Sequence, residues 1–340
     1  MIEDYRPLSP TSRFLLSAAA FVVVVAGMKA AVTLLIPFLL SLFIAVIAAP
    51  PLFYLKDKGV PSGLAMVSVV GMIIIIGLML AWLVGGSLND FTSNLPSYQE
   101  ILKQQSQRLV GWLGEQGVEL ELKALTTYFD PSKAMALAGS LMSSLGNVLT
   151  QAFLILITVI FMLFEANAFQ TKLKDHAESP ERSLARVDAI TSSIKRYMVI
   201  KTSTSLLTGI LVAILLALLG VDYPLLWGTL AFLFNYVPNI GSIIAAVPAV
   251  LLALIQLGPQ MAAWTAVGYL IINSVVGNGI EPRFMGKGLG LSPLIVFISL
   301  VFWGWILGPV GMFLSVPLTM TMKIVLDSNP DTRGYAAMLR

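Results

Sequence analysis

The sequence of 340 residues contains no cysteine and a single histidine, His176. Without cysteine the chain can form neither disulfides nor thiolate nucleophiles, and one imidazole leaves little for a metal site or for acid–base catalysis. The sequence also has no HExxH metal motif, no GxSxG nucleophile elbow and no pair of aspartates in adjacent apolar segments of the intramembrane protease type. We therefore expect no enzyme, no catalytic residue and no bound metal or cofactor.

Charged residues are scarce as well, at 11% of the chain against about 25% in a typical soluble domain. Hydrophobic residues make up 57%, and the mean hydropathy is +0.87. Several continuous apolar runs reach the roughly 20 residues that a helix needs to cross a bilayer, and they lack the alternation of a membrane β-barrel. Lysine and arginine flank these runs, so the net charge of +3 fits positive-inside topology and not nucleic-acid binding.

These runs predict an all-α polytopic membrane protein with about six spanning helices. The expected spans lie at about residues 14–28, 31–55, 63–86, 147–164, 202–219 and 261–278. The first resembles a signal sequence but leads at once into a second apolar run, so we interpret it as an uncleaved helix. Lys29 then marks a tight external turn, and the distribution of charge places both termini in the cytoplasm.

Composition divides the chain into six parts. They are three N-terminal membrane helices (1–89), an external amphipathic helical lobe (90–145), a fourth membrane helix (146–169), a basic cytoplasmic helical loop (170–200), a C-terminal membrane domain (201–325) and a cytoplasmic tail (326–340). The lobe is predicted from apolar residues at helical spacing, such as Leu95, Tyr98 and Leu102, among polar ones. Asp130 and Pro131 are typical of a helix start that leads into the fourth span.

Two apolar segments are too long for one upright span. Residues 224–257 would form a helix of about 50 Å, and residues 291–322 pose the same problem. A polar stretch at residues 235–241 interrupts the first segment. The structural breaks in the second are Gly308, Pro309, Gly311 and Pro317. We prefer two re-entrant hairpins, one entering the membrane from outside and one from inside, because this arrangement places the later lysines and arginines in the cytoplasm. In the alternative, both segments cross the membrane as discontinuous helices, which gives eight spans.

Interrupted backbone at membrane depth is tolerated only where it is buried in protein or lines a watery cavity. The first break is therefore the leading candidate for a substrate path, through Asn235, Pro238, Asn239 and Gly241. Its freed peptide groups and two amide side chains would offer donors and acceptors to a polar solute. The alternative is a hairpin turn whose residues only satisfy one another.

A second group of candidate substrate-path residues lies farther along the chain. It consists of Asn273, Asn278, Glu281 and Arg283. The group puts an acid and a base at the end of the charge-free residues 223–280, and ionisable groups in such places are functional candidates by default. The alternative is a structural ion pair of Glu281 with Arg283 or Lys287. Glu165 and Asp222, the other acids near span ends, fit interfacial positions.

Three longer motifs carry a resemblance to a known family. They are FNYVPNIGS at residues 234–242, NGIEPRFMG at 278–286 and FWGWILGPVG at 302–311. Together they resemble the autoinducer-2 exporter family, and the similarity covers nearly the whole chain. The resemblance implies an inner-membrane permease that exports autoinducer-2, a small furanone-derived signal in quorum sensing. It also implies a homo-oligomer, with a pentamer as one candidate assembly, and other branches of the family look like sodium or lithium/proton antiporters.

Three functions remain open from the sequence. The first is export of a small polar solute past the first break, with Glu281 and Arg283 as gate or coupling groups. The second is cation/proton antiport, for which Glu281, Glu165 and Asp222 are the candidate proton carriers. The third is a membrane scaffold that does not transport and acts through the lobe at residues 90–145.

Overall fold

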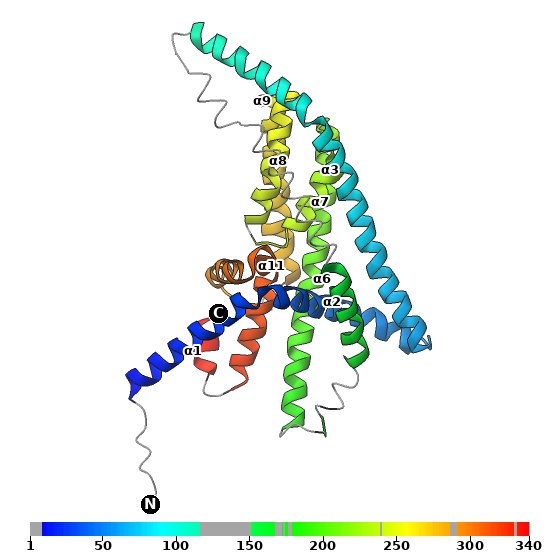
Figure 1. Cartoon of the computed structure of the whole chain (residues 1–340), viewed down its shortest axis with the longest axis vertical. Helices are drawn as coiled ribbons and strands as arrows, with labels where there is room; N and C mark the ends of the chain where they lie inside the picture. The colour runs from blue at the N-terminus through cyan, green and yellow to red at the C-terminus, as the bar shows by residue number, and fades with distance from the viewer. Residues whose placement is uncertain are drawn as a thin grey trace, which may run out of the picture.

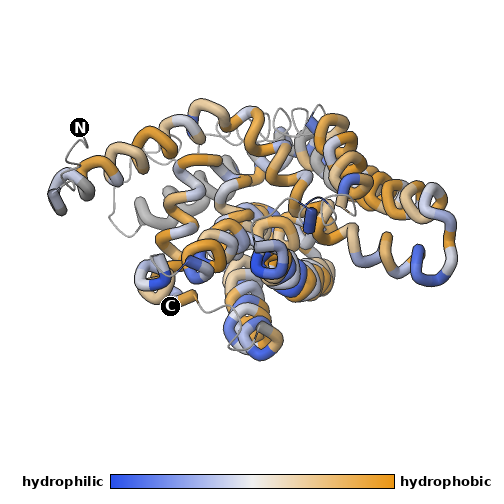
Figure 2. The backbone as a smooth tube through the Cα atoms, turned by 90° about the horizontal axis from the view of Figure 1, so that it is seen from below, coloured by the Kyte–Doolittle hydropathy of each residue, from blue (hydrophilic) through white to orange (hydrophobic). Residues whose placement is uncertain are grey.

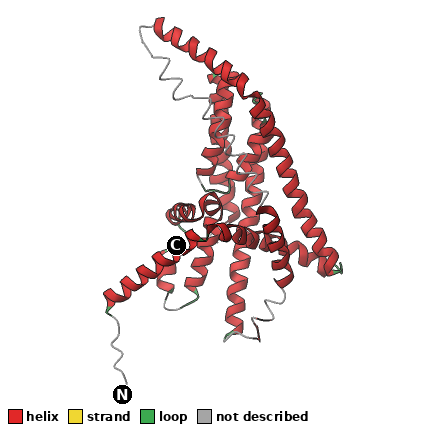
Figure 3. Cartoon of the chain, in the orientation of Figure 1, coloured by secondary structure: helices red, strands yellow, loops and turns green. Residues whose placement is uncertain are grey.

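The computed structural model describes residues 9–115, 151–166, 172, 174–175, 179–238, 240–285, 291–329 and 332–339. Within these residues the chain is helical and contains no strand (Figure 3). Hydrophobic residues run along most of the helices, while hydrophilic residues gather near turns and helix ends (Figure 2). The helices long and apolar enough to cross a membrane are Val32–Asp57, Ser62–Phe91, Pro180–Leu219, Ile240–Leu257, Pro259–Phe284 and Pro293–Asp327. The expected all-α membrane fold with about six such helices is confirmed.

These six helices are not the same six that the sequence predicts. The expected first and fourth spans form shorter apolar helices over the described residues, Leu15–Ala30 and Gln151–Ala166. Two of the six long helices instead come from the segments expected as hairpins, Ile240–Leu257 and Pro293–Asp327. The count agrees because α8 of the first broken segment and the whole of the second, counted across its bend at Gly308, are each long enough to be counted.

Helices α1 (Pro10–Ala30) and α2 (Val32–Asp57) are separated by a single residue, Ala31. Hydrogen bonding continues across it, because the Ala31 amide donates to the carbonyl of Gly27. The two helices run on in the same general direction instead of reversing (Figure 1). The tight turn expected at Lys29 is therefore wrong, because Lys29 lies within α1 and neither glycine nor proline follows it directly to end the helix.

Helix α3 (Ser62–Glu115) contains 54 residues and is roughly 80 Å long at 1.5 Å per residue. It continues without interruption through the boundary expected at residue 90, so the span and the described part of the expected lobe form one helix. The helix start expected at Asp130 and Pro131 lies outside the described residues.

The 40-residue helix α6 (Pro180–Leu219) contains most of the basic stretch expected as a loop together with the fifth expected span. It ends at Gly220, whose φ of 75° is a left-handed conformation that glycine adopts without strain. Helix α7 (Pro224–Phe234) packs closely against it: a Cβ on Gly209 or on Gly228 would lie 2.7 Å from the carbonyl oxygen of the other glycine. Small residues therefore let these two backbones touch, as in many membrane helix pairs.

The turn between α6 and α7 also anchors the far half of α3. Tyr98 donates its hydroxyl to Asp222 over 2.6 Å, and the ring of Phe91 packs edge-on against Trp227 with centroids 5.7 Å apart. Burial, and then this hydrogen bond to Asp222, raise the pKa of Tyr98 above its ordinary value. A tyrosine hydroxyl is protonated at physiological pH even at its ordinary pKa of about 10, and the raised pKa keeps it a donor to still higher pH.

The first interrupted segment forms a hairpin of α7 and α8 (Ile240–Leu257), and both of its ends meet at the end of α6. The side chain of Gln256, near the end of α8, accepts from the amide of Asp222 over 3.0 Å and donates to the carbonyl of Gly220 over 3.3 Å. A segment whose two ends share one partner must double back. Gly241 permits the turn, because a Cβ there would collide with the carbonyl oxygen of Phe234.

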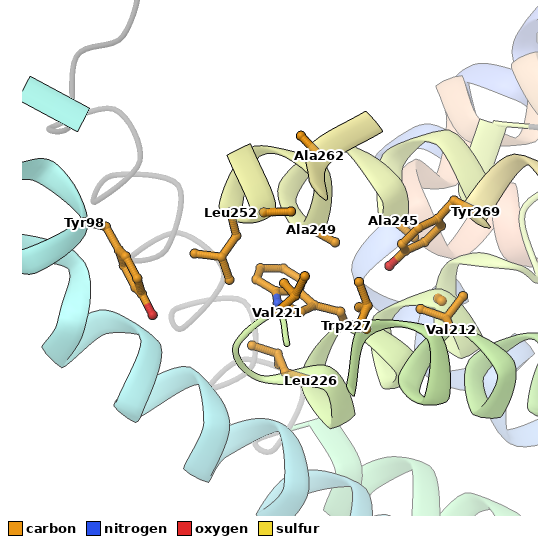
Figure 4. Close-up of a cluster of buried hydrophobic side chains, with 13 residues drawn as sticks. Tyr98, Val212, Val221, Leu226, Trp227, Ala245, Ala249, Leu252, Ala262 and Tyr269 are labelled. Carbon is orange, nitrogen blue, oxygen red and sulfur yellow. The ribbon is translucent and has the colours of Figure 1, made fainter. Parts of the chain in front are cut away.

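The remaining described helices complete the bundle. They are α9 (Pro259–Asn273), the π-helix η1 (Ser274–Ile280), α10 (Glu281–Met285), α11 (Pro293–Asp327) and α12 (Arg333–Met338). A buried apolar cluster joins α3, α6, α7, α8 and α9, and Figure 4 shows its side chains converging from these helices. The cluster ties the α7–α8 hairpin to its neighbours.

Helix α11 is likewise two helices joined by a sharp bend. Gly308 has φ 66° and ψ −150°, which is far from helical, and it immediately precedes Pro309. The indole of Trp303 donates to the hydroxyl of Thr319 over 3.0 Å, although 16 positions separate them in the sequence. The two halves therefore fold back on each other. Pro317, also expected as a break, lies within the second half without leaving helical geometry.

Replacing Gly209 by leucine should force α6 and α7 apart, because the added Cβ would also lie 2.9 Å from the Cβ of Phe232. Overpacking of this kind costs about 1–3 kcal/mol, so we expect a lower thermal unfolding temperature of the purified protein in detergent. The matched control is Gly71→Leu in α3, where no described atom lies within 4 Å of the added Cβ. An equal loss of stability in the two variants would contradict the close helix contact.

Candidate functional site

A cavity of about 670 Å³ lies among α6, the α7–α8 break, α8, α9, η1 and α10. Apolar side chains of α8 and α9 make up much of its wall. Its polar and charged lining residues include Lys201, Asn235, Ser242, Asn273, Asn278 and Glu281. This volume suits a small solute, and a mostly apolar wall with a few converging polar groups is the usual composition of a small-molecule site.

A buried ion pair closes one side of the cavity. Lys201 Nζ on α6 lies 2.8 Å from Oε1 and 2.9 Å from Oε2 of Glu281, the first residue of α10. The hydroxyl of Thr204 adds a weaker contact to Oε2 at 3.4 Å. The side chain of Lys201 is 5% exposed and that of Glu281 is 15% exposed, so each charge depends on the other for compensation.

The π-helix η1 (Ser274–Ile280) positions Glu281 for this pairing. Its hydrogen bonds connect residues five apart, so it accommodates one more residue per turn than an α-helix and offsets the register of α10 after it. Gly277 and Asn278, within this turn, line the cavity. Single π-turns in α-helices are rare and often occur at functional sites, and this one lines the same cavity as the α7–α8 break.

The α7–α8 break is bound to α6 by side-chain hydrogen bonds. Asn235 Nδ2 donates to the hydroxyl of Ser205 over 3.0 Å, and the hydroxyl of Tyr236 donates to that of Thr202 over 2.7 Å. Asn235 therefore has a structural partner on α6, outside the break, and also lines the cavity. Pro238 lines the cavity as well.

The structure gathers some of the sequence-predicted residues and separates others. Those it brings around the cavity are Asn235, Pro238, Asn273, Asn278 and Glu281. Asn239 lies outside the described residues, and Gly241 serves the tight hairpin turn. Arg283 is exposed and does not line the cavity. Gly308, Pro309, Gly311 and Pro317 belong to the α11 hairpin instead.

Sequence reasoning missed Lys201, which stands in the sequence at the end of a run of basic residues. The expected partners of Glu281 were Arg283 and Lys287; Arg283 is exposed, and Lys287 lies outside the described residues. The missed signal is the polar run directly after Lys201, residues 202–205, because it marks a polar face on the first turns of an otherwise apolar span.

The two other acids considered as proton carriers lie elsewhere. Glu165 is 57% exposed and pairs with Lys172, and Asp222 accepts the hydroxyl of Tyr98. Neither residue lines the cavity. Glu281 does line it, but Lys201 compensates its charge.

Glu281→Gln should destabilise the protein strongly, because it leaves the Lys201 ammonium buried without a counter-charge. Removing one partner of a buried pair costs about 3–5 kcal/mol, whereas breaking an exposed pair costs less than about 1 kcal/mol. Thermal unfolding in detergent checks this, with Glu165→Gln as the exposed control. Lys201→Met combined with Glu281→Gln should cost less than the sum of the single variants. Additive losses would contradict the pairing.

Comparison with known proteins agrees with this architecture. Residues 18–331 match the sequence profile of AI-2E family transporters. The chain is 41% identical over 320 residues to the AI-2 transport protein TqsA of Escherichia coli, covering 94% of this chain and 92% of TqsA. It is 42% identical over 333 residues to a Haemophilus influenzae protein named only as a transport protein, covering 96% of each chain. The family profile matches most of the chain, and the relatives align along nearly their full length. This protein therefore belongs to the AI-2E transporter family.

Proposed function

We propose that this protein exports autoinducer-2 and that the cavity beside the Lys201–Glu281 pair is its solute site. The observation that carries the proposal is a solute-sized cavity that is lined by the α7–α8 break and the π-helix η1 inside an apolar bundle. Polar backbone and buried charge are expensive in such surroundings and persist where they line a functional path. The relative TqsA, named as an AI-2 transport protein, supports the choice of solute.

The chemistry of the cavity favours a small polar solute without net charge. Lys201 and Glu281 compensate each other, so the lining presents no net charge from this pair. Asn273 and Asn278 each carry an amide that can donate and accept, and Ser242 adds a hydroxyl. The apolar side chains of α8 and α9 would cover the carbon skeleton of the solute.

Charge also supports an orientation in the membrane. Arg182, Arg186, Lys195 and Arg196 are exposed along the first half of α6, and positive-inside topology puts this half in the cytoplasm. The α7–α8 hairpin would then enter from the outside and the α11 hairpin from the cytoplasm, with both termini cytoplasmic. We place the protein in the bacterial inner membrane as a homo-oligomer, with a pentamer as the candidate assembly, on the strength of the family.

Flux of autoinducer-2 from proteoliposomes that contain the purified protein tests this function. Wild-type protein should accelerate flux over protein-free vesicles. Ala246→Leu should slow it by about tenfold or more, because three added carbons would project from α8 into the cavity and displace solute.

The matched control is Ala263→Leu, on an exposed position of α9 that does not line the cavity. It makes the same chemical change and should leave flux near the wild-type rate. Wild-type flux no faster than in empty vesicles would overturn the proposed solute. Equal flux in both leucine variants would overturn the proposed site.

A further inference from the structure

Two hydroxyl groups in α9 are buried without a hydrogen-bond partner. Thr265 is 0% exposed and Tyr269 is 2% exposed, and no described protein atom bonds to Thr265 Oγ1 or to the Tyr269 hydroxyl. Threonines in other helices show the usual pairing: the hydroxyls of Thr158 and Thr208 each donate to the carbonyl four residues earlier. The two unpaired hydroxyls therefore need an explanation of their own.

A purely structural role does not explain them. Valine has nearly the shape of threonine and phenylalanine nearly that of tyrosine, and neither buries an unsatisfied hydroxyl. Leaving such a group unpaired costs free energy, whereas an apolar replacement of the same shape is neutral or stabilising. A buried hydroxyl without a partner would lower the stability of this conformation, which is the pattern expected of a group that binds a partner in another state.

The two residues lie along α9 from the cavity wall into the apolar cluster. Tyr269 lines the cavity and also belongs to the apolar cluster, and Figure 4 shows its ring beside Ala245 and Val212 with the hydroxyl directed into the cluster. Thr265 lies one turn before Tyr269 on α9, on the same face as Ala262, another member of that cluster. This direction leads away from Glu281 and toward the end of α9 that begins at Pro259.

Helix α6 faces α9 along this whole length, and we call the line of contact between the two helices the seam. Glu281 pairs with Lys201 at one point, and farther along a Cβ on Gly268 would meet the side chain of Leu215. Helix α9, with η1 and α10 after it, therefore runs antiparallel to α6. On the α9 side of the seam, Thr265, Tyr269 and Asn273 follow one another at intervals of four residues, which places them on one side of the helix, and Glu281 follows after η1.

We propose that Thr265 and Tyr269 form a second solute station that extends the cavity from Tyr269 in its wall to Thr265, closed in this structure and opened when the α7–α8 hairpin moves from α9. Each hydroxyl would exchange hydrogen bonds with a hydroxyl or carbonyl group of an uncharged solute. The buried members of the surrounding cluster are apolar apart from aromatic hydroxyl and indole groups, and the Asp222 carboxylate beside the cluster already accepts a hydrogen bond from Tyr98, so the station suits an uncharged solute. This inference rests on the proposed function, because it assigns residues to the same solute path.

The test combines Thr265→Val with Tyr269→Phe and measures autoinducer-2 flux in proteoliposomes together with the thermal unfolding temperature. We expect flux to fall by about tenfold or more, from the loss of two neutral hydrogen bonds to the moving solute. The unfolding temperature should stay equal or rise, because the two unsatisfied hydroxyls are gone. Thr265→Ser, which keeps the hydroxyl and loses only the methyl group, should retain most of the flux.

The control combines Thr158→Val with Tyr54→Phe, which makes the same two chemical changes at positions that do not line the cavity. If flux in the Thr265→Val, Tyr269→Phe variant equals flux in this control, the proposed station is overturned. A lower unfolding temperature would overturn it too, by showing that the hydroxyls are paired in the folded protein. Wild-type protein without flux would instead overturn the proposed function, and the two failures are therefore distinguishable.

Discussion

The need to pair every backbone amide and carbonyl without help from water shapes this protein. In an apolar bundle a regular helix meets that need by itself, and a break meets it only where neighbouring groups supply partners. In the α7–α8 break the backbone groups pair within the break itself, since the amide of Val237 donates to the carbonyl of Phe234 and that of Gly241 to the carbonyl of Val237. Side chains of α6 then bind the side chains of Asn235 and Tyr236 and hold the break in place. The irregular π-turn lines the same cavity. These two departures from regular helix thus occur together around one solute-sized space, while the bend at Gly308 lies apart from it in the α11 hairpin.

Helix α6 connects these parts. One face packs backbone to backbone against α7 through Gly209 and Gly228, and another holds Glu281 through Lys201. A shift of α6 relative to the π-turn would expose two buried charges, so the pair favours a discrete closed arrangement over a continuous range of positions. A transporter needs such distinct states, and a pair that is buried in one of them can help to define it.

Much of this arrangement is predictable from local chemistry. Overlong apolar runs, and the proline and glycine residues within them, predict where α8 begins and where α11 bends. Glu281 stands out because it comes after a long charge-free stretch. The partner of Glu281 is not predictable in this way, because Lys201 lies 80 positions away and pairs with it only through the antiparallel contact of α6 with η1 and α10. Local reasoning chose Arg283, which is near in sequence and exposed in the structure.

Two other features also differ from what the sequence pattern suggests. Ala31 carries the hydrogen bonds of α1 into α2, although a lysine between apolar runs is typical of a turn. Thr265 and Tyr269 look in the sequence like ordinary helix residues, and only the packed bundle shows that no described group satisfies them. The sequence pattern therefore identifies where helices break, while the packing identifies which polar groups share the resulting space.

The central claim is that the cavity holds the solute, and site-directed labelling tests it most directly because the natural chain has no cysteine. In Asn278→Cys the single thiol would lie in the cavity wall, and autoinducer-2 should slow its reaction with a polar maleimide. Tyr335→Cys, on exposed α12, should react at the same rate with and without solute. If autoinducer-2 at saturating concentration leaves the labelling rate of Asn278→Cys unchanged, the account is contradicted.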